Sequence, residues 1–150
     1  MAAANDTATL GPLDSFVGYH MRRASARMSV DFHAAMAETG IRQVVFGVLS
    51  VIAANPGINQ GQIGKVLGIQ RANMVSLIGE LTDAGYVSRT TSPEDRRAFV
   101  FQLTDRGAAA FADGLARIRL HEDRLLRDLS VGERETLVAL LKRIQASGAD

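Results

Sequence analysis

The apolar positions along this chain recur mostly every three or four residues, which is the period of an amphipathic helix. In the first third, the pattern predicts a long helix over about 13–37 and a second helix over 41–54. Gly40 lies between them as a stop signal, and the Asn55-Pro56-Gly57 sequence breaks the second helix.

Two shorter helices with a tight, glycine-containing turn between them come next. Asn59 and Gln62 have the spacing of a capping box, and Gly68 ends the first short helix. The second short helix ends at Gly85, and its inward-facing positions follow the i, i+3, i+4, i+7 pattern. These positions are Met74, Leu77, Ile78 and Leu81. Such a pair of helices is typical of a helix-turn-helix.

The period then changes from helical spacing to alternation. Tyr86 to Thr90 predicts a strand, residues 92–95 (Ser-Pro-Glu-Asp) have turn chemistry, and residues 97–103 alternate as a half-buried strand does. A β-hairpin directly after a helix-turn-helix is a wing.

The last third returns to helical spacing, with a helix over about 105–129 and a final helix that Ser130 and Glu133 begin as a capping box. The terminal helices carry more apolar surface than one small winged domain can cover, so we expect them to form a dimer interface. Closure of an intramolecular helical bundle would fit the same periodicity. The interface candidates are Leu13, Phe16, Leu125, Leu129, Leu137, Leu140, Leu141 and Ile144.

We therefore expect a mostly α-helical fold with a small β-hairpin wing: a winged helix-turn-helix whose N- and C-terminal helices form a dimerisation module. Residues 1–12 are expected to be a flexible arm, and 13–150 a single domain. Within that domain, the dimerisation helices are assigned to 13–40 and 105–150, and the winged helix-turn-helix to 41–104.

Composition excludes several classes of chemistry. The chain has 150 residues, and it has no cysteine, which rules out disulfides, thiolate metal sites and a cysteine nucleophile. No signal peptide and no apolar run of membrane-spanning length is visible, so we expect a soluble, cytoplasmic protein with no membrane partner.

The net charge of +1 conceals a local asymmetry. Residues 57–79 contain Lys65 and Arg71 but no acid. Three arginines lie on the predicted hairpin, namely Arg89, Arg96 and Arg97. The helix-turn-helix and its wing are therefore locally basic.

The segment PGINQGQIGKVLGIQRANMVSLIGELTDAGYV, followed by SPEDRRAFVFQLTDRG, resembles the MarR (multiple antibiotic resistance regulator) family of bacterial transcription factors. The resemblance is close over 56–107, and the order of the flanking helices extends it over most of the chain. It implies a homodimer that binds double-stranded operator DNA, usually a repressor relieved by a small, often aromatic, anionic ligand, with no cofactor.

The outward face of the second short helix supplies base-reading groups. Amides can bond adenine in a bidentate manner, and a guanidinium can address guanine or a phosphate. The resemblance implies that Arg97 inserts into the minor groove, and we expect a salt bridge from Asp95 to orient it. Ser76 stands where the family commonly has a basic residue. The DNA-binding candidates are Asn59, Gln60, Gln70, Arg71, Asn73, Ser76, Asp95, Arg96 and Arg97.

A ligand pocket is expected between the first helix and the second. Its candidates combine polar and basic residues of the first helix with a small or apolar wall, namely Tyr19, His20, Arg22, Arg23, Phe46 and Ser50. An arginine over an apolar cleft suits an aromatic carboxylate or an acyl-CoA thioester. Arginines that are solvated, or paired across the dimer, are an equal alternative.

Catalysis is not expected. The three histidines lack metal-ligand spacing; His20 is interpreted as a packed or pocket residue, and His33 and His121 as surface residues. No phosphate loop and no nucleophile elbow is present. The alternative function is a winged-helix ligand-binding or protein-docking module without operator recognition, because Ser76 and Gly79 weaken the reading helix.

Overall fold

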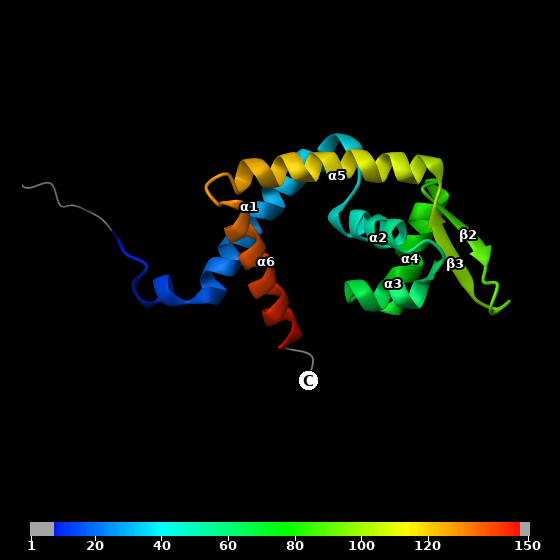
Figure 1. Ribbon diagram of the computed structural model, residues 1–150, viewed down its shortest axis with the longest axis horizontal. Coiled ribbons are helices and arrows are strands. Elements are labelled where there is room, and N and C mark those ends of the chain that lie inside the picture. Colours follow the sequence, from blue (N-terminus) through cyan, green and yellow to red (C-terminus); the bar gives the residue numbers. More distant parts are fainter. Residues whose placement is uncertain (1–7, 148–150) are drawn as a thin grey trace, which may run out of the picture.

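A long helix connects two ends of the molecule in the computed structural model, which describes residues 8–147 (Figure 1). This helix is α5 (Asp105–Leu125). At one end lie α1 (Val17–Met36) and α6 (Val131–Ala146). At the other end are the reading-head elements: α2 (Gln43–Ala54), α3 (Gln60–Leu67), α4 (Arg71–Asp83) and a small sheet. The expected fold class, mostly helical with a winged helix-turn-helix, is confirmed.

The first helix begins later than the apolar period predicts. Gly11–Ser15 forms a separate 3₁₀ helix, η1, and Phe16 is extended with ψ of 115° before α1 starts at Val17. Pro12 lacks a backbone N–H and has a fixed φ, so it suits the start of a short turn such as η1. Residues 1–7 of the expected N-terminal arm lie outside the described residues.

Both capping boxes that the sequence predicts are present in the structure. In both predicted capping boxes, the side chain of the N-cap residue accepts from the backbone N–H three residues later, and the reciprocal bond is present. For Asn59 and Gln62 these two distances are 2.9 and 3.2 Å. The fifth helix, however, ends at Leu125 and not at 129, so Leu129 lies in the loop before α6.

The wing contains one strand more than the predicted hairpin. Strands β2 (Val87–Thr91) and β3 (Phe99–Leu103) pair antiparallel, as expected. A further strand, β1 (Ile58–Asn59), pairs with the other edge of β3 and places Ile58 opposite Phe101. Two residues are too short for alternation to be visible in a sequence. Since β1 leads directly into α3, it ties the helix-turn-helix to the wing.

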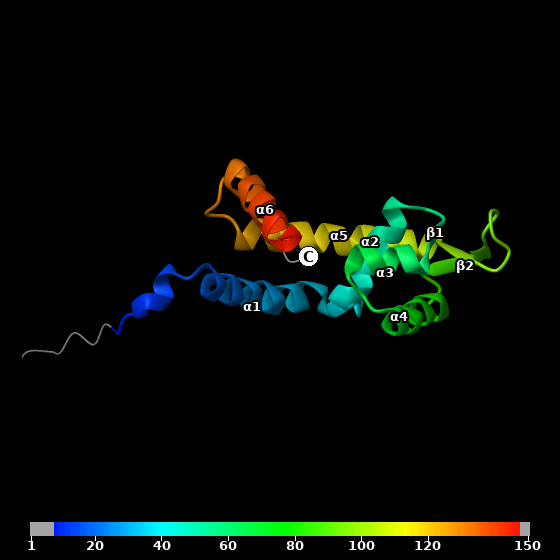
Figure 2. The same ribbon diagram turned by 90° about the horizontal axis from the view of Figure 1, so that it is seen from below.

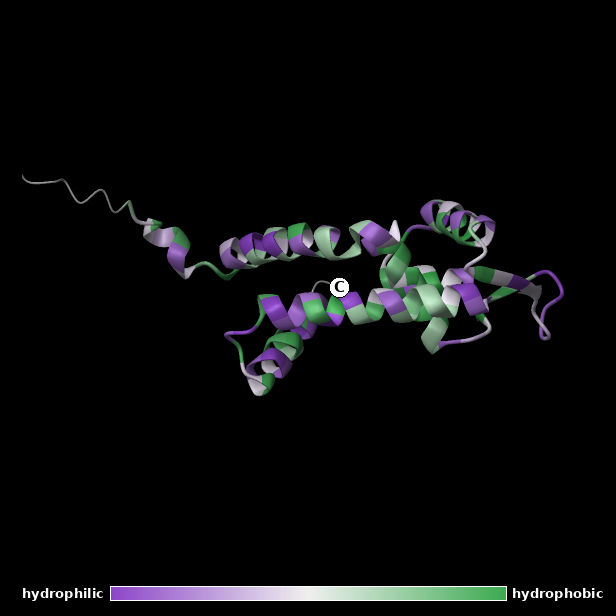
Figure 3. Cartoon of the chain, turned by 90° about the horizontal axis from the view of Figure 1, so that it is seen from above, coloured by the Kyte–Doolittle hydropathy of each residue, from purple (hydrophilic) through white to green (hydrophobic). Residues whose placement is uncertain are grey.

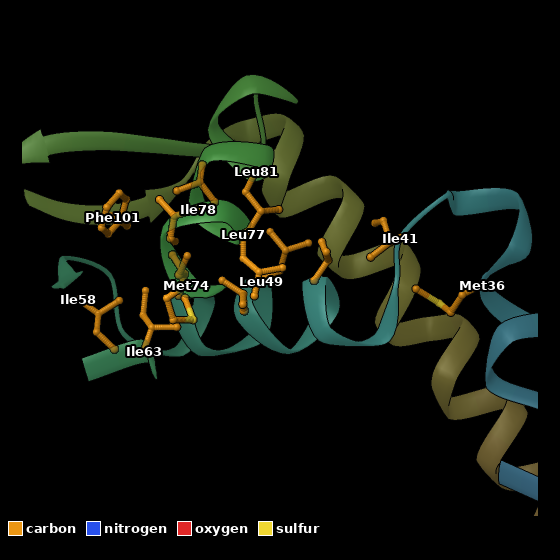
Figure 4. Packing of buried hydrophobic residues seen from close by; sticks show 14 of the residues in the cluster. Met36, Ile41, Leu49, Ile58, Ile63, Met74, Leu77, Ile78, Leu81 and Phe101 are labelled. Atoms are coloured by element: carbon orange, nitrogen blue, oxygen red, sulfur yellow. The ribbon is translucent and has the colours of Figure 1, made fainter. Parts of the chain in front are cut away.

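Most of the apolar core lies in the reading head, and Phe32 and Met36 of α1 extend it (Figure 4). All four predicted inward positions of α4 are buried, from Met74 to Leu81. They pack with Leu49 and Ile52 of α2 and with Ile63 of α3. Burial of this many branched side chains accounts for the position of α4 relative to α2 and α3.

The helix α2 is strongly apolar because it runs through this core, with Val48, Leu49 and Ile52 fully buried.

Among the residues described, no single helix is both long and apolar enough to cross a membrane. The segments Val17–Thr39 and Gln43–Ala54 meet those criteria only when taken together, and they are bent by 74°.

The other end of the molecule is more open. Helices α1 and α5 run alongside each other (Figure 2), and the Arg117 guanidinium bonds Glu38 at 3.0 Å and Asp113 at 2.9 Å. The hydrogen bond to Glu38, followed by that to Asp113, raises the pKa of Arg117. Helix α6 contains no buried residue, although hydrophobic residues recur along it (Figure 3).

Candidate nucleic-acid interface and ligand cavity

The recognition helix α4 presents an uncapped N-terminus. Gln70 at its N-cap makes no side-chain hydrogen bond to the helix, so the first-turn N–H groups remain available to a phosphate. Arg71, Asn73 and Ser76 of α4 are exposed. Arg71 and Gln70 also line a hollow of about 660 Å³ between α3 and α4, to which Lys65 contributes a second positive charge.

A close approach of α3 to α4 sets the shape of this hollow. A Cβ atom added to Gly64 would lie 2.9 Å from the backbone oxygen of Ile69 and 3.1 Å from Cγ of Met74. Only glycine at this position allows the two helices to pack so closely.

Of the two DNA-binding candidates at the start of α3, Gln60 lines the hollow, whereas the side-chain oxygen of Asn59 is already bonded to the Gln62 N–H.

An ion pair that the sequence reasoning missed lies beside the reading residues. Glu80 follows Ser76 by one helical turn on the outward side of α4, and its carboxylate accepts a hydrogen bond from the Arg42 guanidinium. This pairing offsets a negative charge next to the candidate DNA-binding residues of α4. Arg42 precedes Glu80 by 38 residues, so no local spacing indicates the contact.

The wing turn is organised by Asp95, but not in the way predicted. The Arg97 backbone N–H donates to Oδ1 of Asp95 at 2.9 Å, and within residues 8–147 neither Arg96 nor Arg97 has an ion-pair partner. The expected Asp95–Arg97 salt bridge is therefore wrong, because a carboxylate two residues away folds back onto the backbone in an Asx-type turn. Both guanidinium groups remain exposed and available to a ligand.

A further arginine of the wing is held by an aromatic ring. The Arg89 guanidinium lies 3.9 Å from the ring centroid of Phe99 on the neighbouring strand. From the sequence alone, Arg89 is predicted only as local positive charge. Phe99 shares a face of β3 with the buried Phe101 but is itself 44% exposed, and Arg89, which pairs with Phe101 in the strand register, lies beside its ring. Stacking of this kind restrains a guanidinium without removing its charge.

A cavity of about 810 Å³ lies where α1, α5 and α6 meet the reading head. Phe46 and Ser50 of α2 line it, as does Leu67 at the end of α3. The α1 residues in the lining recur at helical spacing and share one face of that helix: Met21, Ala24, Ser25, Met28, Ser29 and Phe32.

The other four ligand candidates do not line this cavity. Tyr19, Arg22 and Arg23 form a cluster in which the exposed guanidinium groups have their carbons 5.7 and 5.8 Å from the ring centroid of the half-buried Tyr19. His20 is exposed and bonds the backbone oxygen of Asp14 at 2.8 Å, so its interpretation as a packed residue is wrong. The helical period separates these residues from the face that carries Met21 and Met28.

Phe46 is tightly fixed in the cavity wall. Its ring stacks on that of Phe111 with centroids 5.4 Å apart. A Cβ atom at Gly114, three residues further along α5, would approach Cε2 of Phe46 to 2.8 Å. The ring therefore links α2 of the reading head to α5 through direct packing.

His121 also lines the cavity, and its expected surface position is wrong. The side chain is only 3% exposed, and its ring packs edge-on against Phe32 with centroids 6.4 Å apart. Nδ1 of His121 is buried and has no hydrogen-bond partner among the described residues. The adjacent Glu122 also lines the cavity but is exposed. Because an acid follows His121 directly, the sequence pattern predicted a surface position for the histidine as well.

The dimer-interface candidates remain largely uncovered in the single chain. Phe16 is 56% exposed, and Leu137, Leu140 and Ile144 of α6 are 41–49% exposed. Leu13 is exposed as well, while Leu125, Leu129 and Leu141 are half-buried. The structure thus shows no intramolecular bundle that buries α6, and an apolar groove of about 440 Å³ lies between Val17, Met21 and that helix.

Comparisons with known proteins agree with this architecture. The family model described as MarR family matches residues 39–98. A curated relative from Thauera aromatica, described as a putative transcriptional regulatory protein for the hcr operon, is 32% identical over 145 residues, which covers 95% of this chain and 87% of the relative.

Two solved structures of the transcriptional repressor CouR are similar over nearly the whole chain. CouR bound to a 23-mer DNA duplex is 37% identical with a TM-score of 0.85, covering 92% of this chain and 98% of CouR. CouR bound to p-coumaroyl-CoA is 35% identical with a TM-score of 0.78, covering 91% of this chain and 96% of CouR. The chain belongs to the MarR family of transcriptional regulators, as the motifs in residues 56–107 predicted.

Proposed function

We propose that this protein is a cytoplasmic transcriptional repressor that binds a pseudo-palindromic operator as a homodimer and is released from it by an aromatic acyl-CoA thioester. The observation that carries the effector class is the lining of the 810 Å³ cavity, which combines aromatic and aliphatic walls with no arginine or lysine among the described lining residues.

DNA binding rests on the exposed edge of the reading head. The uncapped start of α4 can bind a phosphate, and Gln70, Arg71 and Asn73 lie on the first turns that reach base edges in a major groove. The unpaired Arg97 guanidinium at the wing suits a narrow minor groove, whose negative potential attracts such groups. The similarity to CouR bound to a DNA duplex supports this use.

Dimerisation rests on the exposed apolar side chains of η1, α1 and α6. A two-fold dimer would cover Phe16, Leu140 and Ile144 and would place two recognition helices for half-sites about 10 base pairs apart. A palindromic operator requires that geometry.

The cavity favours a neutral acyl group over a free carboxylate. A buried carboxylate is stabilised best by a cation, and the described lining contains no arginine or lysine, while Glu122 adds a negative charge. A thioester carries no charge at its acyl end, so its aromatic group can occupy the cavity while the anionic nucleotide stays outside. The Tyr19–Arg22–Arg23 cluster is a candidate for that nucleotide. CouR bound to p-coumaroyl-CoA supports the ligand class.

Release follows from the position of the cavity. Its walls come from α1, α5 and α6 on one side and from α2 and Leu67 of α3 on the other. A ligand that fits only one arrangement of these parts shifts the population toward that arrangement. If the favoured arrangement changes the spacing of the two recognition helices, both half-sites cannot be contacted in register.

Calorimetric titration of the purified protein with p-coumaroyl-CoA, free p-coumarate and CoA tests the effector class. We expect saturable binding of the thioester, with the free acid at least ten-fold weaker. Equal or tighter binding of the free acid would contradict the proposed class. A gel shift with DNA upstream of the protein's own gene tests operator binding, and absence of any sequence-specific shift would favour a protein-docking role.

A further inference from the structure

The buried imidazole of His121 is unusual in its surroundings. Of the residues that the structure describes, it is the one polar or charged side chain that is buried. It belongs to the cavity lining, beside Phe32 and near the apolar side chains of Ile118 and Leu141. Neither the DNA-binding surface nor the dimer face uses this residue.

An unpartnered ring nitrogen in such a place disfavours folding. Burial strips water from Nδ1, and no described group replaces it. A buried polar group left without a partner destabilises the folded state, whereas a leucine or phenylalanine of similar size would pack there without that cost. Of the other polar side chains of the lining, Ser25, Gln43 and Glu122 are exposed, and Ser29 and Ser50 are half-buried. His121 therefore has unused hydrogen-bonding capacity in the wall of the cavity.

We propose that His121 is the specificity-determining residue of this cavity and hydrogen-bonds a hydroxyl group on the aromatic ring of the acyl ligand. The assignment rests on the proposed function and deepens it: the ligand is a hydroxylated aryl thioester, with its ring against Phe32 and Phe46 and its hydroxyl at His121.

The chemistry of both groups fits this pairing. A neutral imidazole has one donor and one acceptor nitrogen, and a phenolic hydroxyl can donate or accept, so either tautomer of His121 makes a bond. A ligand without the hydroxyl would leave the imidazole as unpartnered as it is in the free protein. The preference for the hydroxylated ligand therefore follows from the hydrogen bond gained at His121, and not from a change in shape.

Two thioesters that differ only by this hydroxyl test the proposal: p-coumaroyl-CoA and cinnamoyl-CoA. We expect calorimetric titration of the native protein to show at least ten-fold tighter binding of the hydroxylated thioester. In His121→Phe, the ratio should fall to within about two-fold, chiefly through weaker binding of p-coumaroyl-CoA. His121→Asn, which keeps a donor and an acceptor, should restore part of the ratio and serves as the second variant if the phenylalanine does not fold.

His33→Phe is the matched control, because His33 also packs edge-on against Phe32, with centroids 6.2 Å apart, but lies exposed on α1. Its ratio should equal that of the native protein. Equal binding of both thioesters to the native protein, or an unchanged ratio in a folded His121→Phe, would overturn the role of His121 and leave the proposed function standing. Binding of neither thioester would overturn the proposed function itself, and this assignment with it.

Discussion

The backbone N–H of Arg97 donates to the carboxylate of Asp95 across 2.9 Å, so the acid shapes the wing turn and leaves the arginine side chain unpaired. The N–H groups of Glu94 and Asp95 also converge on Oγ of Ser92, at 3.2 and 3.4 Å. The turn is therefore ordered by its own side chains before any DNA is present, and the guanidinium needs no ion pair broken when it meets a groove.

Arg97→Ala should weaken operator binding at physiological salt by at least ten-fold and leave folding unchanged, because the exposed guanidinium has no partner within the described residues. Fluorescence anisotropy with a labelled operator fragment measures the effect. Arg127→Ala is the control, since Arg127 is exposed in the loop before α6, at the end of the molecule away from the reading head. An affinity for Arg97→Ala equal to that of the control would contradict the minor-groove role.

Asp95→Ala and Asp95→Asn should separate turn geometry from charge. Asparagine keeps a side-chain oxygen that can accept from the Arg97 N–H, and it removes a negative charge near DNA, so its operator affinity should match or exceed the native value. Alanine also removes the charge but loses the acceptor, so it should bind several-fold more weakly than asparagine. Equal affinities of the two variants would show that the hydrogen bond does not organise the wing.

Two glycines should respond in opposite directions to the same substitution. A Cβ at Gly107 would lie 1.9 Å from the backbone oxygen of Tyr86, whereas a Cβ at Gly79 would meet no atom within 4 Å. Gly107→Ala should destabilise the protein by about 2 kcal/mol or more, because backbone must move. Gly79→Ala should stabilise it by about 1 kcal/mol, through helix propensity. Urea unfolding measures both, and a stable Gly107→Ala would contradict the close packing of α5 on this turn.

The capping box of α6 should make stability depend on pH in the acid range. Hydrogen bonds from the Ser130 hydroxyl, and then from its backbone N–H, lower the pKa of Glu133. A carboxyl with a lowered folded-state pKa contributes stability above its unfolded value, and that contribution is lost as the pH falls through the folded pKa. Ser130→Ala should raise the Glu133 pKa toward its ordinary value. An NMR titration that finds the same pKa in both proteins would refute the cap's influence.

Local patterns in the sequence predicted most of the reading head. The i, i+3, i+4, i+7 pattern from Met74 to Leu81 identified the buried face of α4, and the Asn59–Gln62 pair identified the start of α3. These features depend on neighbours within a few residues, where helical geometry alone relates position to contact.

The features that were missed depend on contacts distant in the sequence or on very short elements. The Arg42–Glu80 ion pair joins residues that only the folded helix-turn-helix brings together. The β1 strand has two residues and exists through its pairing with β3. His121 turns inward beside an exposed acid, so hydropathy placed it at the surface. Local charge points to Arg22 and Arg23 as pocket residues of α1, whereas the largely apolar face of that helix lines the cavity.

In the proposed function, an aryl-CoA thioester and the operator favour different arrangements of one dimer. The direct test is the anisotropy of a labelled fragment from the region upstream of the protein's own gene, titrated with p-coumaroyl-CoA at constant protein concentration. We expect the anisotropy to fall to the value of the free DNA as the thioester saturates the protein, while CoA and free p-coumarate have no effect at the same concentration. DNA that stays fully bound at saturating thioester would contradict it.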